Sequence, residues 1–157
     1  MIKEIVGKNQ GKGKKIGIIV SRFNDFITHR LLDGCINELV KNGVKQNDIT
    51  VCWVPGAYEI PLAAQKLAKK KNIHAVICLG AIIRGQTFHY ELVAQGSAVG
   101  IMQAMLATGK PIIFEVLSAD TVELINDRSQ VKGPNKGRDA ALVALEMIDL
   151  IAQLNRK

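Results

Sequence analysis

The sequence predicts an α/β fold in which one parallel sheet carries helices on both faces. Four short apolar runs rich in Ile and Val alternate with longer segments whose apolar residues recur every three or four positions. Strands that alternate with helices are typical of right-handed βαβ units, which build a doubly wound parallel sheet. The 157 residues show no internal repeat, so we expect residues 1–157 to form a single domain with residues 1–15 as an N-terminal arm.

The arm and the first predicted βα unit come first in the chain. A glycine-rich basic link isolates the apolar stretch 2–6, which we expect to add as a strand to the sheet edge of a neighbouring subunit. Residues 16–20 are only Ile, Gly and Val, as in a strand buried on both faces. A helix with one apolar face follows from about residue 26 to 42 and ends at Gly43, a common residue after a helix.

The middle of the chain repeats this alternation. Residues 49–54 form the second predicted strand, and Pro55-Gly56 turns the chain. The next helix covers about 61–71, because proline suits the first turn of a helix. The apolar run 74–79 is the third predicted strand.

The last part of the chain contains three further helices and one strand. The long helix 89–108 is rich in Ala, Leu, Met and Gln, and its many small residues allow close packing. Residues 111–117 form the fourth predicted strand, and a short helix covers about 122–128. A loop at 130–137 leads to the final helix, from about 138 to 154.

Composition limits the classes of function. The apolar fraction of 48% indicates a globular protein, and the net charge is +7, with lysines gathered within residues 12–15 and at 69–71. Such clusters attract anionic substrates or nucleic acid, or they only solvate helix ends and a basic terminal segment. Aromatic residues make up 4% and none lies among these lysines, so a stacking surface for single-stranded nucleic acid is not expected.

Neither a disulfide framework nor a membrane segment is expected. Cys35, Cys52 and Cys78 are far apart and odd in number, and the last two fall in apolar strands as small core residues do. No apolar run approaches the roughly 20 residues needed to cross a bilayer, and the charged start does not resemble a signal peptide. We therefore expect a cytoplasmic protein that binds neither a membrane nor nucleic acid.

The junction before the long helix carries the strongest functional pattern. The spacing Gly80-x4-Gly85-Gln86-Thr87 nearly matches the P-loop, Gly-x4-Gly-Lys-Ser/Thr, whose backbone amides cradle phosphate. Gln86 replaces the lysine, so neither nucleoside triphosphate hydrolysis nor a nucleotide-dependent switch is expected. The amides that open the helix can still bind an anion, with the titratable imidazole of His89 beside it. The alternative is a plain strand-to-helix turn with a surface histidine.

Two further candidates follow predicted strands. Phe23 comes at the carboxyl end of the first strand, where ligands of open α/β sheets bind. It would stack on a planar ring, or it would be a core or interface residue. Glu59 follows the second strand, and it would accept hydrogen bonds from ligand hydroxyls or lie in solvent at a helix start.

Five motifs occur in the order found in a known family. They are Arg22-Phe23-Asn24, Val54-Pro55-Gly56-Ala57-Tyr58-Glu59-Ile60-Pro61, Gly80-x-x-Ile83-Arg84-Gly85-x-Thr87-x-His89-Tyr90, Asn135-Lys136-Gly137 and Ala144-Leu145-Glu146-Met147. With these motifs the chain resembles the lumazine synthase family over nearly its whole length. The second and third motifs are the most specific.

The resemblance implies both a fold and a reaction. The fold is a three-layer, flavodoxin-like arrangement with a four-stranded parallel sheet. The reaction is the penultimate step of riboflavin biosynthesis, which condenses 5-amino-6-(D-ribitylamino)uracil with 3,4-dihydroxy-2-butanone 4-phosphate. The products are 6,7-dimethyl-8-ribityllumazine, phosphate and water. The family uses no metal and no organic cofactor.

The resemblance also implies which residues bind the ribitylaminouracil. Phe23 matches the residue that stacks on the pyrimidine, and Glu59 matches the one that accepts hydrogen bonds from hydroxyls. Phe114 matches a residue supplied by the adjacent subunit. The other residues that match this part of the site are Ala57, Tyr58, Ala81, Ile82 and Ile83.

The phosphate end of the site is implied in the same way. Gln86 and Thr87 match the turn that cradles the phosphate, and His89 matches the catalytic proton-transfer residue. Arg128 matches an arginine of the adjacent subunit that would clamp the phosphate with two charged hydrogen bonds. Two supporting residues are Lys136, as a second cation near the phosphate, and Asp139, as a carboxylate that orients the histidine.

Some positions depart from the commonest pattern of the family. Ala81 replaces a frequent threonine, and Leu124 replaces a frequent glutamine. Glu115 and Gln130 stand where glycine is common, which affects the local backbone near the shared site. None of these changes removes a chemical group that the reaction needs.

The resemblance implies a homo-oligomer, because Phe114 and Arg128 would complete a neighbour's site. The family forms pentamers, and some members assemble twelve of them into an icosahedral 60-mer; the length of the loop 130–137 favours the larger shell. Association with riboflavin synthase stays open. A non-catalytic flavin-binding or shell-forming protein is the alternative, although a shell would need none of Phe23, Glu59, His89 and Arg128.

Overall fold

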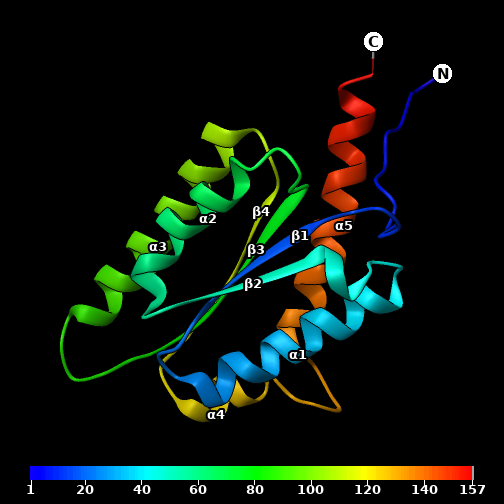
Figure 1. Cartoon of the computed structure of the whole chain (residues 1–157). Coiled ribbons are helices and arrows are strands. Elements are labelled where there is room, and N and C mark those ends of the chain that lie inside the picture. The colour runs from blue at the N-terminus through cyan, green and yellow to red at the C-terminus, as the bar shows by residue number, and fades with distance from the viewer. Residues whose placement is uncertain (157) are drawn as a thin grey trace.

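A computed structural model describes residues 1–156 and contains four parallel strands between two layers of helices (Figure 1). The strands are β1 (Ile16–Ser21), β2 (Ile49–Val54), β3 (Ala75–Ile83) and β4 (Ile112–Ala119), in the spatial order β2-β1-β3-β4. All three strand pairs are parallel. The predicted three-layer α/β fold with a four-stranded parallel sheet is therefore confirmed.

The two central strands are buried on both faces. Every residue of β1 is buried, and so is every residue of β3 except Ile83. Ile18 of β1 pairs with Val51 of β2 on one side and with Ile77 of β3 on the other. Apolar β-branched side chains suit such positions, since they pack well against the layers above and below a sheet.

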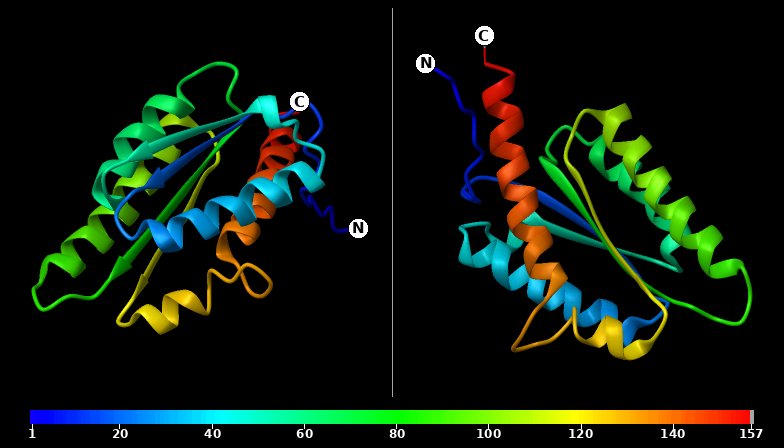
Figure 2. Two further views of the ribbon diagram at one scale, coloured as in Figure 1. Left: turned by 60° about the horizontal axis from the view of Figure 1, so that its bottom comes forward. Right: turned by 180° about the vertical axis from the view of Figure 1, so that it is seen from behind.

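Helices cover both faces of the sheet (Figure 2). One layer contains α1 (Asp25–Lys41) and α5 (Lys136–Leu154), and the other contains α2 (Ile60–Ala68) and α3 (His89–Thr108). Between the sheet and each layer lies an apolar core, which includes Leu31 and Leu145 on one face and Ile60 and Ile101 on the other. The short elements η1 (Gln46–Asp48), η2 (Ala57–Glu59) and α4 (Val122–Asn126) lie in the connections.

The cysteines belong to this interior. Cys35 and Cys78 are buried, Cys52 is half-buried, and all three are free thiols. Burial raises the pKa of both the Cys35 and the Cys78 thiol well above its usual range. These thiols are therefore protonated and behave as small apolar side chains.

The third strand is longer than the sequence indicated. β3 continues through Gly80 to Ile83, because the long edge strand β4 pairs with it along its whole carboxyl half, from Gly80 with Val116 to Ile83 with Ala119. The predicted end at Leu79 is wrong, and so is the P-loop-like turn that placed Gly80 in the junction. Gly80 serves packing instead, since a Cβ atom there would lie 3.0 Å from Val116 Cγ1.

Other boundaries shift by a few residues. α2 begins directly after η2 and ends at Ala68 rather than near residue 71. α5 begins at Lys136 rather than 138, because the Asn135 side chain accepts a hydrogen bond from the Arg138 amide (3.1 Å) and caps the helix. α3 and β2 have the predicted bounds.

Residues 1–10 form neither helix nor strand and lie beside α5 (Figures 1 and 2). Gln153 Nε2 donates a hydrogen bond to the Val6 carbonyl (2.8 Å), and the Lys8 amide donates to Asp149 Oδ2 (2.9 Å). The addition of this arm to a neighbour's sheet stays a prediction. No helix within residues 1–156 combines the length and apolar character needed to cross a membrane.

Candidate active site

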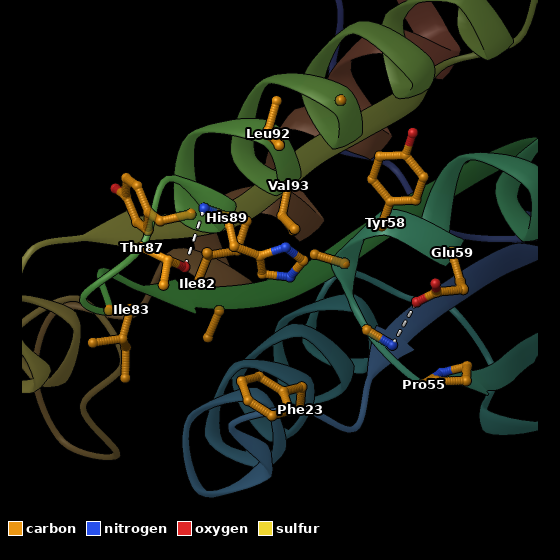
Figure 3. Close-up of a pocket in the computed structure, with 16 residues that line it drawn as sticks. Phe23, Pro55, Tyr58, Glu59, Ile82, Ile83, Thr87, His89, Leu92 and Val93 are labelled. Atoms are coloured by element: carbon orange, nitrogen blue, oxygen red, sulfur yellow. Dashed lines mark hydrogen bonds between the residues drawn. The ribbon is translucent and has the colours of Figure 1, made fainter.

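A cavity of about 760 Å³ opens at the carboxyl ends of β1, β2 and β3, beside the start of α3 (Figure 3). This edge of a parallel sheet is where ligands of open α/β folds bind. Nine residues predicted from the sequence line it: Phe23, Ala57, Tyr58, Glu59, Ala81, Ile82, Ile83, Thr87 and His89. The sequence therefore identified most of one continuous surface.

Phe23 lies just beyond β1 and is 71% exposed, so it is not a core residue in this chain. The following Asn24 has a φ of 59°, in the left-handed region, and its Nδ2 donates to the Ala81 carbonyl (2.8 Å). Asparagine is one of the few residues that adopt this conformation readily. The tight turn into α1 thus ties the end of β1 to β3 and leaves the phenyl ring at the cavity (Figure 3).

The segment after β2 forms the second wall. Glu59 Oε2 accepts a hydrogen bond from the Gly56 amide (2.9 Å), which fixes its carboxylate at the cavity edge. The Tyr58 ring lies against Gly96 of α3, where a Cβ atom would come within 2.7 Å of Tyr58 Cε2. The glycine on α3 therefore makes room for the tyrosine that lines the site.

The third wall comes from β3 and the first turn of α3. Thr87 Oγ1 accepts a 3.4 Å hydrogen bond from the His89 amide at the start of α3. The His89 imidazole points into the space between Phe23 and Tyr58 (Figure 3). An imidazole and a hydroxyl at a helix N-terminus can hold an anion and transfer protons beside it.

Sequence reasoning missed the face of α3 that continues this wall. Leu92, Val93 and Gly96 line the cavity at spacings of three, four and seven residues from His89. That spacing places four residues on one helix face, so the pattern alone could have found them. Tyr90 also lines the cavity, from the next position along the helix.

The remaining predicted residues do not line this cavity within one chain. Gln86 lies in the turn before α3, and Phe114 is 45% exposed on the edge strand β4. Arg128 lines a smaller hollow of about 270 Å³, which it shares with Tyr90, and its Nη1 donates to the Leu124 carbonyl (2.6 Å). The predicted role of Phe114 and Arg128 in a neighbour's site stays a prediction.

Lys136 and Asp139 form an ion pair (3.2 Å) at the start of α5, on the sheet face opposite α3. Asp139 therefore does not orient His89 of its own chain, and its predicted role could be filled only toward another subunit. Glu115 of β4 lies near this pair. Burial raises the pKa of the Glu115 carboxyl to about 7, with Lys136 acting against the rise and Asp139 adding to it.

The electrostatics of the cavity are uneven. The described residues that line it include an acidic residue, Glu59, and a histidine, His89, but no arginine or lysine. Its other walls are mainly apolar or aromatic. These features define an open α/β protein with a cavity of small-molecule size at the carboxyl edge of its sheet, whose described lining residues include no arginine or lysine.

Comparison with known proteins identifies the family. A family model described as 6,7-dimethyl-8-ribityllumazine synthase matches residues 13–152. The 6,7-dimethyl-8-ribityllumazine synthase of Syntrophus aciditrophicus (strain SB) is 52% identical over 148 residues, which cover 94% of this chain and 96% of that protein. The one of Protochlamydia amoebophila (strain UWE25) is 48% identical over 154 residues, or 98% of this chain and 90% of that protein. The chain belongs to the 6,7-dimethyl-8-ribityllumazine synthase family.

Proposed function

We propose that the protein is a 6,7-dimethyl-8-ribityllumazine synthase, a transferase that condenses 5-amino-6-(D-ribitylamino)uracil with 3,4-dihydroxy-2-butanone 4-phosphate. The observation that carries this proposal is the meeting of Phe23, Glu59 and His89 in one cavity, in a chain about half identical to synthases of that name. A non-catalytic shell or flavin carrier would need no imidazole there, so that alternative is not favoured.

The uracil would lie on Phe23, because an exposed phenyl ring beside an apolar wall offers a stacking face. Its ribityl hydroxyls would donate to Glu59, whose carboxylate is held by the Gly56 amide. The apolar residues 81–83 and Val93 would enclose the ring edge. Such enclosure orients the two amines of the uracil toward the second substrate.

The butanone phosphate would lie toward the start of α3. Its phosphate would bind the amides and hydroxyl at Thr87. The ring amine attacks the ketone and water leaves as an imine forms; phosphate is then eliminated, and the second amine closes the ring with loss of another water. His89 would carry protons between these groups, since an imidazole both accepts and donates near neutral pH.

The missing cation supports a shared site. A phosphate ester in a cavity without arginine or lysine would be poorly held, so Arg128 of an adjacent subunit would complete the site. Phe114, exposed on the edge strand, would close it over the uracil. We therefore also propose that the active protein is a homo-oligomer, with a pentamer or an icosahedral 60-mer as the family's forms.

An absorbance assay for lumazine formation tests the proposed function. His89→Ala should lower kcat by about 10²–10⁴-fold, the usual contribution of a proton-transfer group. His29→Ala is the matched control, since His29 packs against Trp53 (ring centroids 4.7 Å apart) and does not line the cavity. If the His89 variant turns over as fast as the wild type, His89 is not the proton-transfer residue. If the wild type forms no lumazine, the proposed synthase activity is wrong.

A further inference from the structure

Arg84 lies in the turn between β3 and α3, next to residues that line the cavity, but does not line the cavity itself. Its neighbours Ile83 and Gly85 line the cavity, but the Arg84 side chain does not. The Arg84 amide donates to the Ala119 carbonyl (3.0 Å), and Arg84 Nε donates to Asp120 Oδ1 (2.5 Å). One residue thus fastens this turn to the segment that follows β4.

The same guanidinium also contacts two residues in the first turn of α3. Arg84 Nη1 donates to Glu91 Oε1, and the guanidinium carbon lies 4.3 Å from the centre of the Tyr90 ring. Stacking and forked hydrogen bonding are two properties that the planar guanidinium combines and a lysine ammonium lacks. Glu91 and Tyr90 directly follow His89, so this contact bears on the helix turn that carries the imidazole.

Arg84 favours the ionised form of the Glu91 carboxyl. The hydrogen bond from Arg84 lowers the pKa of the Glu91 carboxyl, and hydrogen bonds to Asp120 and Glu91 raise the pKa of Arg84. The second carboxylate oxygen, Oε2, is buried and has no hydrogen-bond partner among the described residues. Without Arg84, a carboxylate two residues from His89 would lose its counter-ion.

We propose that Arg84 is a positioning residue for the reaction, whose guanidinium holds the first turn of α3 against the β4–α4 connection and so places Thr87 and His89 at the cavity. This proposal rests on the proposed function. Arg84 is not among the residues that line the cavity. It acts through Glu91 and Asp120, which anchor the two ends of its fork.

The kinetic test compares Arg84→Lys and Arg84→Ala with a matched control. Lys110 is a cation at the opposite end of the sheet, and its Nζ ties together the Lys70 (2.7 Å) and Ile73 (2.8 Å) carbonyls. Lys110→Met therefore also removes a cation that joins two connections, but far from the start of α3. We expect each Arg84 variant to lose about 10–100-fold in kcat, because a displacement of about 1 Å costs that much. The KM for the butanone phosphate should rise, and the KM for the uracil should change little.

A pH profile separates positioning from folding. In Arg84→Ala the unpaired Glu91 carboxylate favours the protonated imidazole of His89, so the acid limb of kcat/KM should move to higher pH. Arg84→Lys keeps a positive charge nearby, and its limb should stay near that of the wild type. Adding Glu91→Gln to Arg84→Ala should return the limb toward its original position. If the acid limb of the kcat/KM profile lies at the same pH in all three variants as in the wild type, the charge on Glu91 does not affect His89.

Amide hydrogen exchange supplies a readout that does not depend on the reaction. Exchange at residues 85–91 and 119–121 should accelerate in Arg84→Lys and stay unchanged in Lys110→Met. If the wild type makes no lumazine, the proposed function fails while this measurement still tests the structural part of the proposal. If kinetics and exchange of the Arg84 variants both match those of Lys110→Met, Arg84 is not a positioning residue.

Discussion

At the scale of single residues, Glu115 links the pH of the medium to folding. Burial against the α5 side of the sheet raises the pKa of this carboxyl to about 7, and Lys136 and Asp139 are the charged groups that face it. A glutamate in an unfolded chain has a pKa of about 4.3. The folded state therefore binds this proton more tightly, so Glu115 favours folding in acid and disfavours it as pH rises from about 4.5 to 7.

We predict that Glu115→Gln flattens the pH dependence of stability. Between pH 5 and pH 8 the wild type should lose about 1 kcal/mol more free energy of unfolding than the variant, a figure reduced because the side chain is partly exposed to screening water. Urea unfolding at both pH values measures it. A variant whose stability falls with pH as steeply as that of the wild type would contradict the assignment.

The sequence identified which residues carry useful chemical groups, but it did not determine the environment of those residues in the fold. The sequence left Phe23 as either a stacking face or a core residue, and only the turn at Asn24 decides for exposure at the cavity. Glu59 was left between ligand and solvent, and its bond from Gly56 places it at the cavity edge. The Asn24 bond reaches Ala81 of β3, 57 positions along the chain, which a local pattern does not contain, whereas the bond from Gly56 to Glu59 spans only 3 positions.

At the scale of elements, α3 gives the site its shape through two glycines on one face. Gly96 receives the Tyr58 ring, and Gly100 receives Pro61 of α2, where a Cβ atom would lie 2.7 Å from Pro61 Cγ. Both allow α3 to approach the segment after β2 closely. Only the first of them faces a residue that lines the cavity.

We predict that Gly96→Ala raises the KM for the ribitylaminouracil, because the new methyl group pushes the Tyr58 ring into the cavity. Gly100→Ala is the matched control on the same helix face. Each change should cost about 1–3 kcal/mol of stability through overpacking. Steady-state kinetics on folded protein should then show a several-fold rise in KM for Gly96→Ala alone. Equal KM values in both variants would show that the Tyr58 ring does not hold the uracil.

Element types and order were predictable, whereas the length of β3 was not. Apolar runs and helical spacing located all four strands and the longer helices. Gly80 looked like the start of a turn, but pairing with the distant strand β4 keeps it in the sheet. The predicted turn therefore included Thr87 and His89 correctly but Gly80 wrongly. The length of β3 depends on pairing with a strand far along the chain, since Gly80 pairs with Val116.

At the scale of the whole molecule, the sequence pattern predicted the layers of the fold. It did not predict whether one chain supplies every residue of the site. Alternating strands and helices dictate a sheet covered on both faces. Phe114 and Arg128 lie outside the cavity of their own chain, and no local pattern says which copy they serve. Only the resemblance to a family suggested an adjacent subunit.

Co-expression of two inactive variants tests whether the site is shared. In a mixed oligomer of His89→Ala and Arg128→Ala chains, a site is intact when its own chain keeps His89 and its neighbour keeps Arg128. With equal, random mixing we expect about a quarter of wild-type activity, the product of two halves. Each variant expressed alone is the control. Activity of the mixture no higher than that of the separate variants would place Arg128 in its own chain's site or outside catalysis.

The cavity without a cation has a consequence for a newly synthesised chain. Before it meets other copies, such a chain could stack the uracil on Phe23, but the described residues that line its cavity include no arginine or lysine to neutralise a phosphate ester. If Arg128 of a neighbour completes the site as proposed, turnover begins only as subunits dock, and assembly switches the enzyme on. A lone folded chain would be a quiescent precursor, however well its own interior is packed.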